Sequence, residues 1–132
     1  MQDHLSQAGV AWNRLPELER LKVEAAWLRV YGQAFRGRPR LRRGSKAEHE
    51  YLSQACDHYL IVPLPSGVSG LPMGMHRRTM GGYECRGPLI EHGAFCDAEF
   101  FISPPDLAWS MIHTHEDHGW GGPYFIRVDW IP

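Results

Sequence analysis

The longest regular alternation of apolar and polar residues lies between Pro16 and Phe35. Its apolar members recur every three or four positions, which is the spacing of one face of an α-helix. They are Leu18, Leu21, Ala25, Leu28 and Phe35, with Trp27 and Tyr31 widening the stripe. Pro16 suits a first helical turn, where its missing N–H costs nothing. The polar face mixes both signs of charge, unlike the basic face of a membrane-surface helix. The pattern predicts an amphipathic helix over about residues 16–35, with its apolar stripe packed on the core.

A basic segment follows this helix. Residues 36–46, RGRPRLRRGSK, carry six basic side chains and are interrupted by two glycines and a proline, which prevent a helix. We therefore expect a mobile basic loop over 36–46. A second, shorter helix is predicted from Lys46 to Cys56, with Ser45 as its N-cap and Glu48 completing a capping box.

The rest of the chain carries the patterns of β-strands. The apolar run HYLIVPL at 58–64 predicts a buried strand, and short strands are expected around 76–80 and 83–85. Three more strands are predicted at Glu99–Ser103, Leu107–Thr114 and Tyr124–Ile131. Their short connections predict antiparallel pairing. Period-2 alternation places Leu107, Trp109, Met111 and His113 on one face of their strand.

These patterns predict an α+β fold. The N-terminal amphipathic helix (about 16–35) and the short second helix pack on an antiparallel sheet formed mainly by residues 58–131. A chain of 132 residues fits one domain, 1–132. It has no apolar run of about 18 residues that could span a membrane. The first residues lack the features of a signal peptide, and three cysteines do not form a disulfide framework. We expect a cytoplasmic protein.

The charge distribution is polarised although the net charge is only −1. Residues 1–46 hold 10 basic and 4 acidic side chains, whereas residues 47–132 hold 4 basic and 11 acidic ones. Such asymmetry marks a partner surface, or two halves that attract each other within one fold. The basic segment 36–46 contains no aromatic residue on which a nucleobase could stack, so nucleic acid is the less favoured partner.

A histidine-rich string is the most conspicuous candidate for chemistry. His113, His115, Asp117 and His118 fit the metal-binding motif of metallo-β-lactamase-type hydrolases, in which the metal turns a bound water into hydroxide. That fold requires further ligands downstream, and residues 119–132 offer only Asp129 and no histidine. We interpret the match as coincidence. A different divalent-metal site built on these residues stays open as an alternative.

Another reading of the same segment comes from a longer pattern. Trp109 is followed by Thr114-His115-Glu116 and then by Gly122-Pro123-Tyr124-Phe125. This segment resembles the bacterial domain-of-unknown-function family 4275, over about thirty residues. The resemblance implies that His115 and Glu116 are the pair that matters and that His113, Asp117 and His118 are incidental. His115 is then either a hydrogen-bonded clasp of the hairpin or, with Glu116, a base and its orienting acid in a cleft.

The resulting hypothesis is a small binding protein without catalysis, whose partner is another protein. An immunity protein that neutralises a bacterial toxin is one form of it. No complete catalytic constellation is visible in the sequence, so an enzyme is the less favoured class, and no cofactor is expected. The alternatives are a small metal-dependent hydrolase centred on the histidine string, and a nucleic-acid-binding accessory protein that uses residues 36–46.

Overall fold

A computed structural model of the chain describes residues 2–36, 40–65, 68, 81–91, 99–114 and 121–132. Within these residues the helices are α1 (Gln2–Gln7), α2 (Glu17–Tyr31) and α3 (Ser45–Leu52), with a short 3-10 helix at Val128–Trp130. The strands are β1 (Ala11–Arg14), β2 (Arg42–Arg43), β3 (His58–Pro63), β4 (Tyr83–Arg86), β5 (Phe100–Ser103), β6 (Trp109–His113) and β7 (Tyr124–Arg127).

The strands form one sheet in the order β1-β4-β3-β5-β6-β7-β2, and every neighbouring pair is antiparallel. The predicted α+β class and antiparallel sheet are therefore confirmed. The outer strands are β1 and β2, which are both short. Among the described residues, no helix has the length and apolar character needed to cross a membrane.

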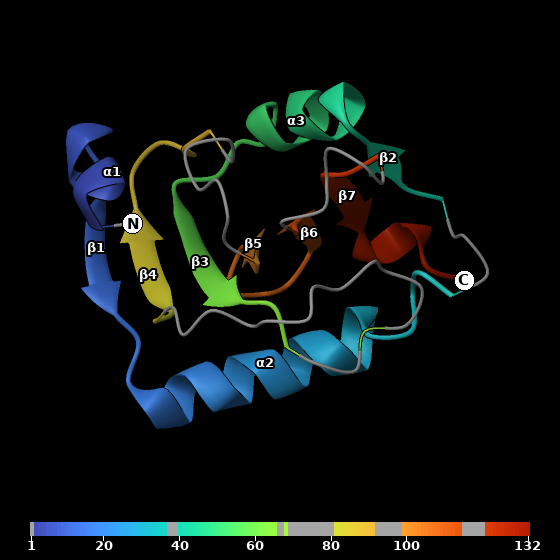
Figure 1. The fold of residues 1–132 in the computed structure, drawn as a ribbon, viewed down its shortest axis with the longest axis horizontal. Helices are drawn as coiled ribbons and strands as arrows, with labels where there is room; N and C mark the ends of the chain where they lie inside the picture. The colour runs from blue at the N-terminus through green and yellow to red at the C-terminus, as the bar shows by residue number, and fades with distance from the viewer. Residues whose placement is uncertain (1, 37–39, 66–67, 69–80, 92–98, 115–120) are drawn as a thin grey trace.

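Helices cover both faces of the sheet (Figure 1). The α1–α3 face is packed by a cluster that includes Leu5, Tyr51, Ile61, Met111 and Phe125. The α2 face is packed by a second cluster that includes Trp27, Tyr31, Val62, Ile112 and Ile126. Alternate residues of one strand enter opposite clusters, as Met111 and Ile112 do, because side chains of a strand alternate between the two faces. The central strands are buried on both sides for this reason.

The long helix lies where it was expected but presents a different face to the sheet. It ends at Tyr31, and residues 33–36 form turns. Leu18 and Leu21, which the spacing placed toward the core, are 73% and 47% exposed. The inward face carries Trp27, Tyr31 and the buried Glu24, whose carboxylate accepts a hydrogen bond from Arg20 Nη1 at 3.1 Å. The predicted stripe is therefore correct for Trp27, Tyr31 and Phe35, which are buried, and wrong for Leu18, Leu21 and Ala25, which are exposed.

The described part of the basic segment is not a loop throughout. Arg42 and Arg43 form β2 and pair with Phe125 and Tyr124 of β7, which corrects the prediction of a loop throughout. The expected capping box is also wrong: Gly44 precedes the helix, Ser45 is its first residue, and no side chain caps it. The helix ends at Leu52 instead of Cys56, with Ser53 as its C-cap residue.

Strands predicted at 58–64, 83–85, Glu99–Ser103 and Leu107–Thr114 are confirmed to within a few residues. The last strand is shorter than predicted, since Val128–Trp130 turns into the 3-10 helix. Leu107 lies before β6 with a positive φ of 59° and packs in the α2 cluster, so it does not share the face of Trp109. The expected strand at 76–80 lies outside the described residues. Helix α1 and strand β1 were not predicted.

Candidate functional site

The end of β6 holds the two described members of the histidine-rich segment. His113 is 9% exposed, and its ring centroid lies 5.2 Å from that of Phe100. Thr114 follows it and is fully buried. Both residues thus belong to the packed interior, and whether His113 is incidental to the function of the motif stays a prediction. The other members lie outside the described residues, so their roles as clasp, base and acid, or metal ligands stay predictions: His115, Glu116, Asp117 and His118.

The aromatic members of the predicted motif are core residues. Trp109 is 5% exposed and packs between the rings of Tyr51 and Phe125, with centroid distances of 5.9 and 5.6 Å. Tyr124 is equally buried and meets Phe35 edge-on at 5.9 Å. Both residues therefore have a structural role. Trp109 packs between the sheet and α3, and Tyr124 packs against the chain that follows α2.

Gly122 and Pro123 bring the chain into β7 through a cis peptide bond. The carbonyl of Pro123 accepts a hydrogen bond from the Gly44 N–H at 2.9 Å, next to the pairing of β2 with β7. This contact joins the start of α3 to the sheet. In the described part of the chain these two motif residues thus have a structural role.

The residues that could carry nucleophilic or metal chemistry are dispersed. Within the described ranges, no three His, Cys, Asp or Glu side chains gather as a metal site. His58 Nε2 lies 2.9 Å from Glu84 Oε2 across β3 and β4. Burial raises the pKa of the Cys56 thiol, whose Sγ donates to the His58 carbonyl at 3.2 Å. Burial also raises the pKa of Cys85 to about 12. Both thiols are therefore protonated at neutral pH and are poor nucleophiles.

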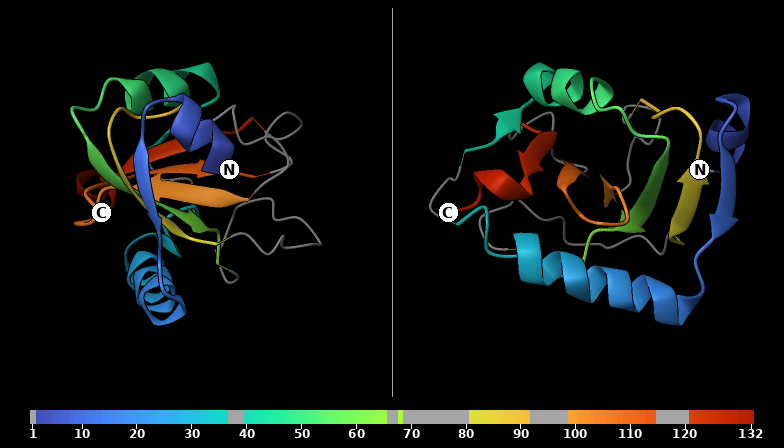
Figure 2. Two further views of the ribbon diagram at one scale, coloured as in Figure 1. Left: turned by 90° about the vertical axis from the view of Figure 1, so that its left-hand side faces the viewer. Right: turned by 180° about the vertical axis from the view of Figure 1, so that it is seen from behind.

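The outer face of α2 carries an exposed apolar strip. Leu18, Leu21 and Ala25 are solvent-exposed and, at spacings of three and four, lie along one side of the helix; we call them the α2 stripe. Lys22 and Arg29 are exposed and border the stripe on one side. Both figures show α2 as the outermost element on its side of the sheet (Figures 1 and 2). The stripe is open to a partner.

The opposite face of α2 is anchored firmly to the sheet. Trp27 Nε1 donates a 2.8 Å hydrogen bond to Ser110 Oγ, and the indole stacks on Phe101 with centroids 4.7 Å apart. One turn later, the Tyr31 hydroxyl donates to the Leu107 carbonyl at 2.6 Å. These buried polar contacts set the rotation of the helix, because leaving either donor unpaired in the interior costs free energy. The α2 stripe is thereby held outward.

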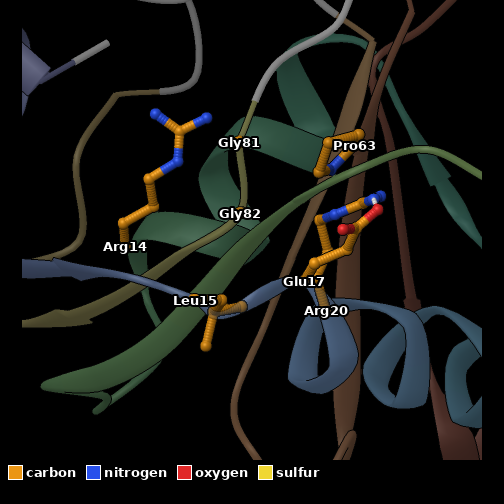
Figure 3. A pocket seen from close by; sticks show the side chains of 7 residues that line it. All are labelled: Arg14, Leu15, Glu17, Arg20, Pro63, Gly81 and Gly82. Atoms are coloured by element: carbon orange, nitrogen blue, oxygen red, sulfur yellow. Dashed lines mark ion pairs between the residues drawn. The ribbon is translucent and has the colours of Figure 1, made fainter.

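A hollow of about 290 Å³ opens near the start of α2. Figure 3 shows Arg14 on one side of it and the paired Glu17 and Arg20 beside Pro63 on the other. Arg20 is 3.1 Å from Glu24 and 3.8 Å from Glu17, so its charge is already compensated. Among the residues that the structure describes, Arg14 forms no ion pair, and the side chains that line the hollow favour no particular ligand.

A basic surface lies beside β2, at the other edge of the sheet. The guanidinium carbons of Arg40 and Arg42 are each 5.3 Å from the centroid of the Trp130 ring, and that of Arg43 is 5.5 Å from the Tyr124 ring. Lys46 is the next exposed cation. We call these four cations and two rings the arginine–aromatic surface. The sequence showed the arginines but not the rings, which come from the far end of the chain.

No family model, curated protein or solved structure matches this chain. The resemblance to the domain-of-unknown-function family 4275 stays a prediction. The surfaces above therefore carry the functional argument.

Proposed function

We propose that this is a non-catalytic binding protein that engages another protein through the α2 stripe. The single observation that supports this proposal most is the exposure of Leu18 and Leu21, at 73% and 47%, on a helix whose other face is anchored in the core. Burying an exposed leucine side chain in an interface contributes roughly 1.5–3 kcal/mol. Adjacent exposed leucines on a rigid helix are accordingly favourable contacts for a partner.

The occupant that best fits the α2 stripe is an amphipathic helix with acidic residues along one border. Apolar residues at positions i, i+3 and i+7 are the pattern on which helix-to-helix recognition rests. Arg29 and Lys22, the latter 3.7 Å from the carboxylate of Glu19, leave a net positive charge along one side of the stripe. Acidic residues beside the partner's apolar stripe would face them, and complementary charge aligns the two helices.

A second copy of the chain fits less well. In an antiparallel pair of identical helices related by a two-fold axis, each flank meets the same flank of the other copy. Lys22 and Arg29 would then face their own equivalents, and juxtaposed like charges disfavour that pairing. We therefore propose a different protein as the partner. A toxin neutralised by an immunity protein is one such partner.

The hydrolase alternative depends on His115, Asp117 and His118, and no observation on the described residues favours it. The nucleic-acid alternative depends on residues 36–46. It is less favoured because guanidinium groups approach the rings of Trp130 and Tyr124 and would compete with a stacking base, and because Tyr124 is only 3% exposed.

The test uses two designed helical peptides with the same leucine stripe, one bordered by glutamate and the other by lysine. Fluorescence anisotropy with the intact protein should show binding of the glutamate-bordered peptide that is at least about tenfold tighter than that of its lysine counterpart. The double variant Leu18→Ser/Leu21→Ser should abolish this binding. It should keep its melting temperature, because exposed side chains contribute little to stability.

Leu52→Ser is the matched control, since Leu52 is 46% exposed on α3, on the opposite side of the sheet. It should bind the peptide as the parent protein does. Equal loss of binding in Leu52→Ser, or equal affinity for both peptides, would refute the proposal. Sedimentation of the free protein as a dimer that dissociates in the Leu18→Ser/Leu21→Ser variant would instead identify a second copy as the occupant.

A further inference from the structure

The arginine–aromatic surface brings together segments that are far apart in the chain. Strand β2 pairs with β7, so Arg42 lies opposite Phe125 and Arg43 opposite Tyr124. The chain after β7 turns through the 3-10 helix and places Trp130 beside Arg40 and Arg42, both at 5.3 Å. Two guanidinium groups thus share one indole, and a third lies over a neighbouring ring.

The rings hold the arginines in place. A guanidinium group is planar and stacks on an aromatic face, where the attraction to the ring is favourable. Arg40 and Arg43 are otherwise exposed, and a free arginine side chain loses much rotational freedom when it binds a ligand. Holding the side chain on a ring before binding removes part of that cost, which is how a preorganised site gains affinity.

The local charge is positive and only partly compensated. Arg42 Nε lies 3.9 Å from Glu50 Oε1, which is a weak ion pair because the distance is too long for a hydrogen bond. Asp129 forms an ion pair with Arg127, whose Nε is 3.2 Å from Asp129 Oδ1. Three cations, Arg40, Arg43 and Lys46, form no ion pair with the described residues. A ligand for this surface is therefore anionic.

The surface is also hollowed. A depression of about 550 Å³ is lined by Arg42, Arg43 and Lys46 together with Leu41 and the backbone of Gly44 and Gly121. Carboxylate side chains are small enough to enter it, and an arginine fork can bind a carboxylate with two parallel hydrogen bonds. Leu41 adds apolar surface that an extended phosphate backbone would not use.

We propose that the arginine–aromatic surface is a binding site for an acidic polypeptide segment, whose aspartate and glutamate carboxylates pair with Arg40, Arg42 and Arg43. The site is separate from the α2 stripe and does not depend on the function proposed for that helix. Acidic peptide is preferred over nucleic acid because base stacking, which gives single-strand binders much of their affinity, needs an open ring face. The faces of Trp130 and Tyr124 are approached by the guanidinium groups themselves.

The experiment compares two labelled probes of equal length and charge at physiological salt, a glutamate-rich peptide and a single-stranded oligonucleotide. We expect the peptide to bind the intact protein more tightly. Replacing Arg40, Arg42 and Arg43 by glutamine together should weaken peptide binding at least about tenfold, since several charge-assisted hydrogen bonds are lost. The control removes positive charge at the opposite edge of the sheet, with Arg14 of β1 and Arg86 of β4 changed to glutamine, and should keep peptide affinity within about threefold, as expected for long-range screening of exposed charges.

Two further variants separate stacked arginines from simple positive charge. Changing the three arginines to lysine keeps the charge but loses the planar fork, and Trp130→Leu keeps the arginines but removes their ring. Both should weaken peptide binding by several-fold while leaving its salt dependence nearly unchanged.

If the lysine variant binds the peptide as well as the parent does, or if the glutamine control loses as much affinity as the arginine variant, the proposed site is wrong. Tighter binding of the oligonucleotide would assign the surface to nucleic acid instead. The melting temperature of each variant distinguishes lost binding from lost folding.

Discussion

Trp27 and Ser110 are 83 residues apart in the sequence and are joined by a buried 2.8 Å hydrogen bond from Nε1 to Oγ. This bond connects the middle of α2 to the centre of the sheet. The indole also stacks on Phe101, so one side chain provides both apolar contact and a directed polar contact. The rotation of α2, and with it the exposure of Leu18 and Leu21, depends on this contact.

Removing the acceptor should destabilise the protein. Ser110→Ala leaves the buried indole N–H of Trp27 without its partner, and we expect a loss of about 1–3 kcal/mol in the free energy of unfolding. Trp27→Phe removes the donor and keeps an aromatic ring. In a double-mutant cycle measured by urea denaturation, the two changes together should therefore cost less than the sum of the single changes. Simple additivity would show that the hydrogen bond contributes nothing.

The core on the α1–α3 face of the sheet is predicted to be sensitive to truncation of Trp109. This ring packs against both Tyr51 and Phe125 and is 5% exposed. Replacing it by alanine leaves a cavity and should cost roughly 3–5 kcal/mol. Trp109→Phe, which refills part of the space, should cost clearly less in the same denaturation experiment. An unchanged melting temperature for Trp109→Ala would contradict the burial described above.

The protein should lose stability at alkaline pH because several of its tyrosines are buried. Exposed tyrosines would not cause this loss. Burial raises the pKa of Tyr31, Tyr51 and Tyr59 above the ordinary value of 10. These phenols are neutral in the folded state and ionise more readily when unfolded. Their contribution to the free energy of unfolding is therefore complete below about pH 10 and is lost as the pH rises toward the folded-state pKa. The loss is at most about 1.4 kcal/mol for each tyrosine and each pH unit.

Absorbance of phenolate and circular dichroism, followed together from pH 8 upward, should show that these tyrosines ionise in the same transition that unfolds the chain. Tyr51→Phe should make the decline of stability with pH less steep, because one ionising group is removed. Smooth titration of all the tyrosines well before unfolding would mean that they are accessible.

His113 is predicted to contribute to the stability of the fold, independently of its role in the motif. It is buried and packs on Phe100, so His113→Ala should lower the free energy of unfolding by about 2 kcal/mol. His113→Phe, which keeps a ring against Phe100, should recover part of this loss.

Metal analysis of the purified protein gives an independent readout for the hydrolase alternative. We expect zinc, manganese and iron well below one equivalent, and a stoichiometric metal lost on His113→Phe would favour the hydrolase.

The strands were the part of the fold that could be read from local pattern. Apolar runs such as HYLIVPL and the alternation around Met111 and Ile112 place strands within a few residues, because the two-residue period of a strand is a local property of the backbone. Short connections then implied antiparallel pairing, which the sheet has. Helix α1 and strand β1 escaped prediction because their short segments carry too few residues to show a period.

The exposed face of α2 could not be read in the same way. Leu18, Leu21 and Ala25 have the spacing of a core face but are exposed. The face with Trp27 and Tyr31 packs on the sheet instead, because Ser110 and the Leu107 carbonyl accept their hydrogen bonds there. Glu24 follows them into the interior because Arg20 compensates its charge. Sequence alone determined that a helix forms at this position. Only the tertiary partners, contributed by residues about eighty positions away, decided its rotation.

The same division holds for the arginine–aromatic surface. The cluster of arginines was evident from the sequence, and so was the lack of an aromatic residue within it. The rings that hold the arginines, Trp130 and Tyr124, reach them because β2 pairs with β7 at the edge of the sheet. Charge density is a property of a local stretch of chain, whereas the rigidity of those charges requires contact between segments that only folding brings together.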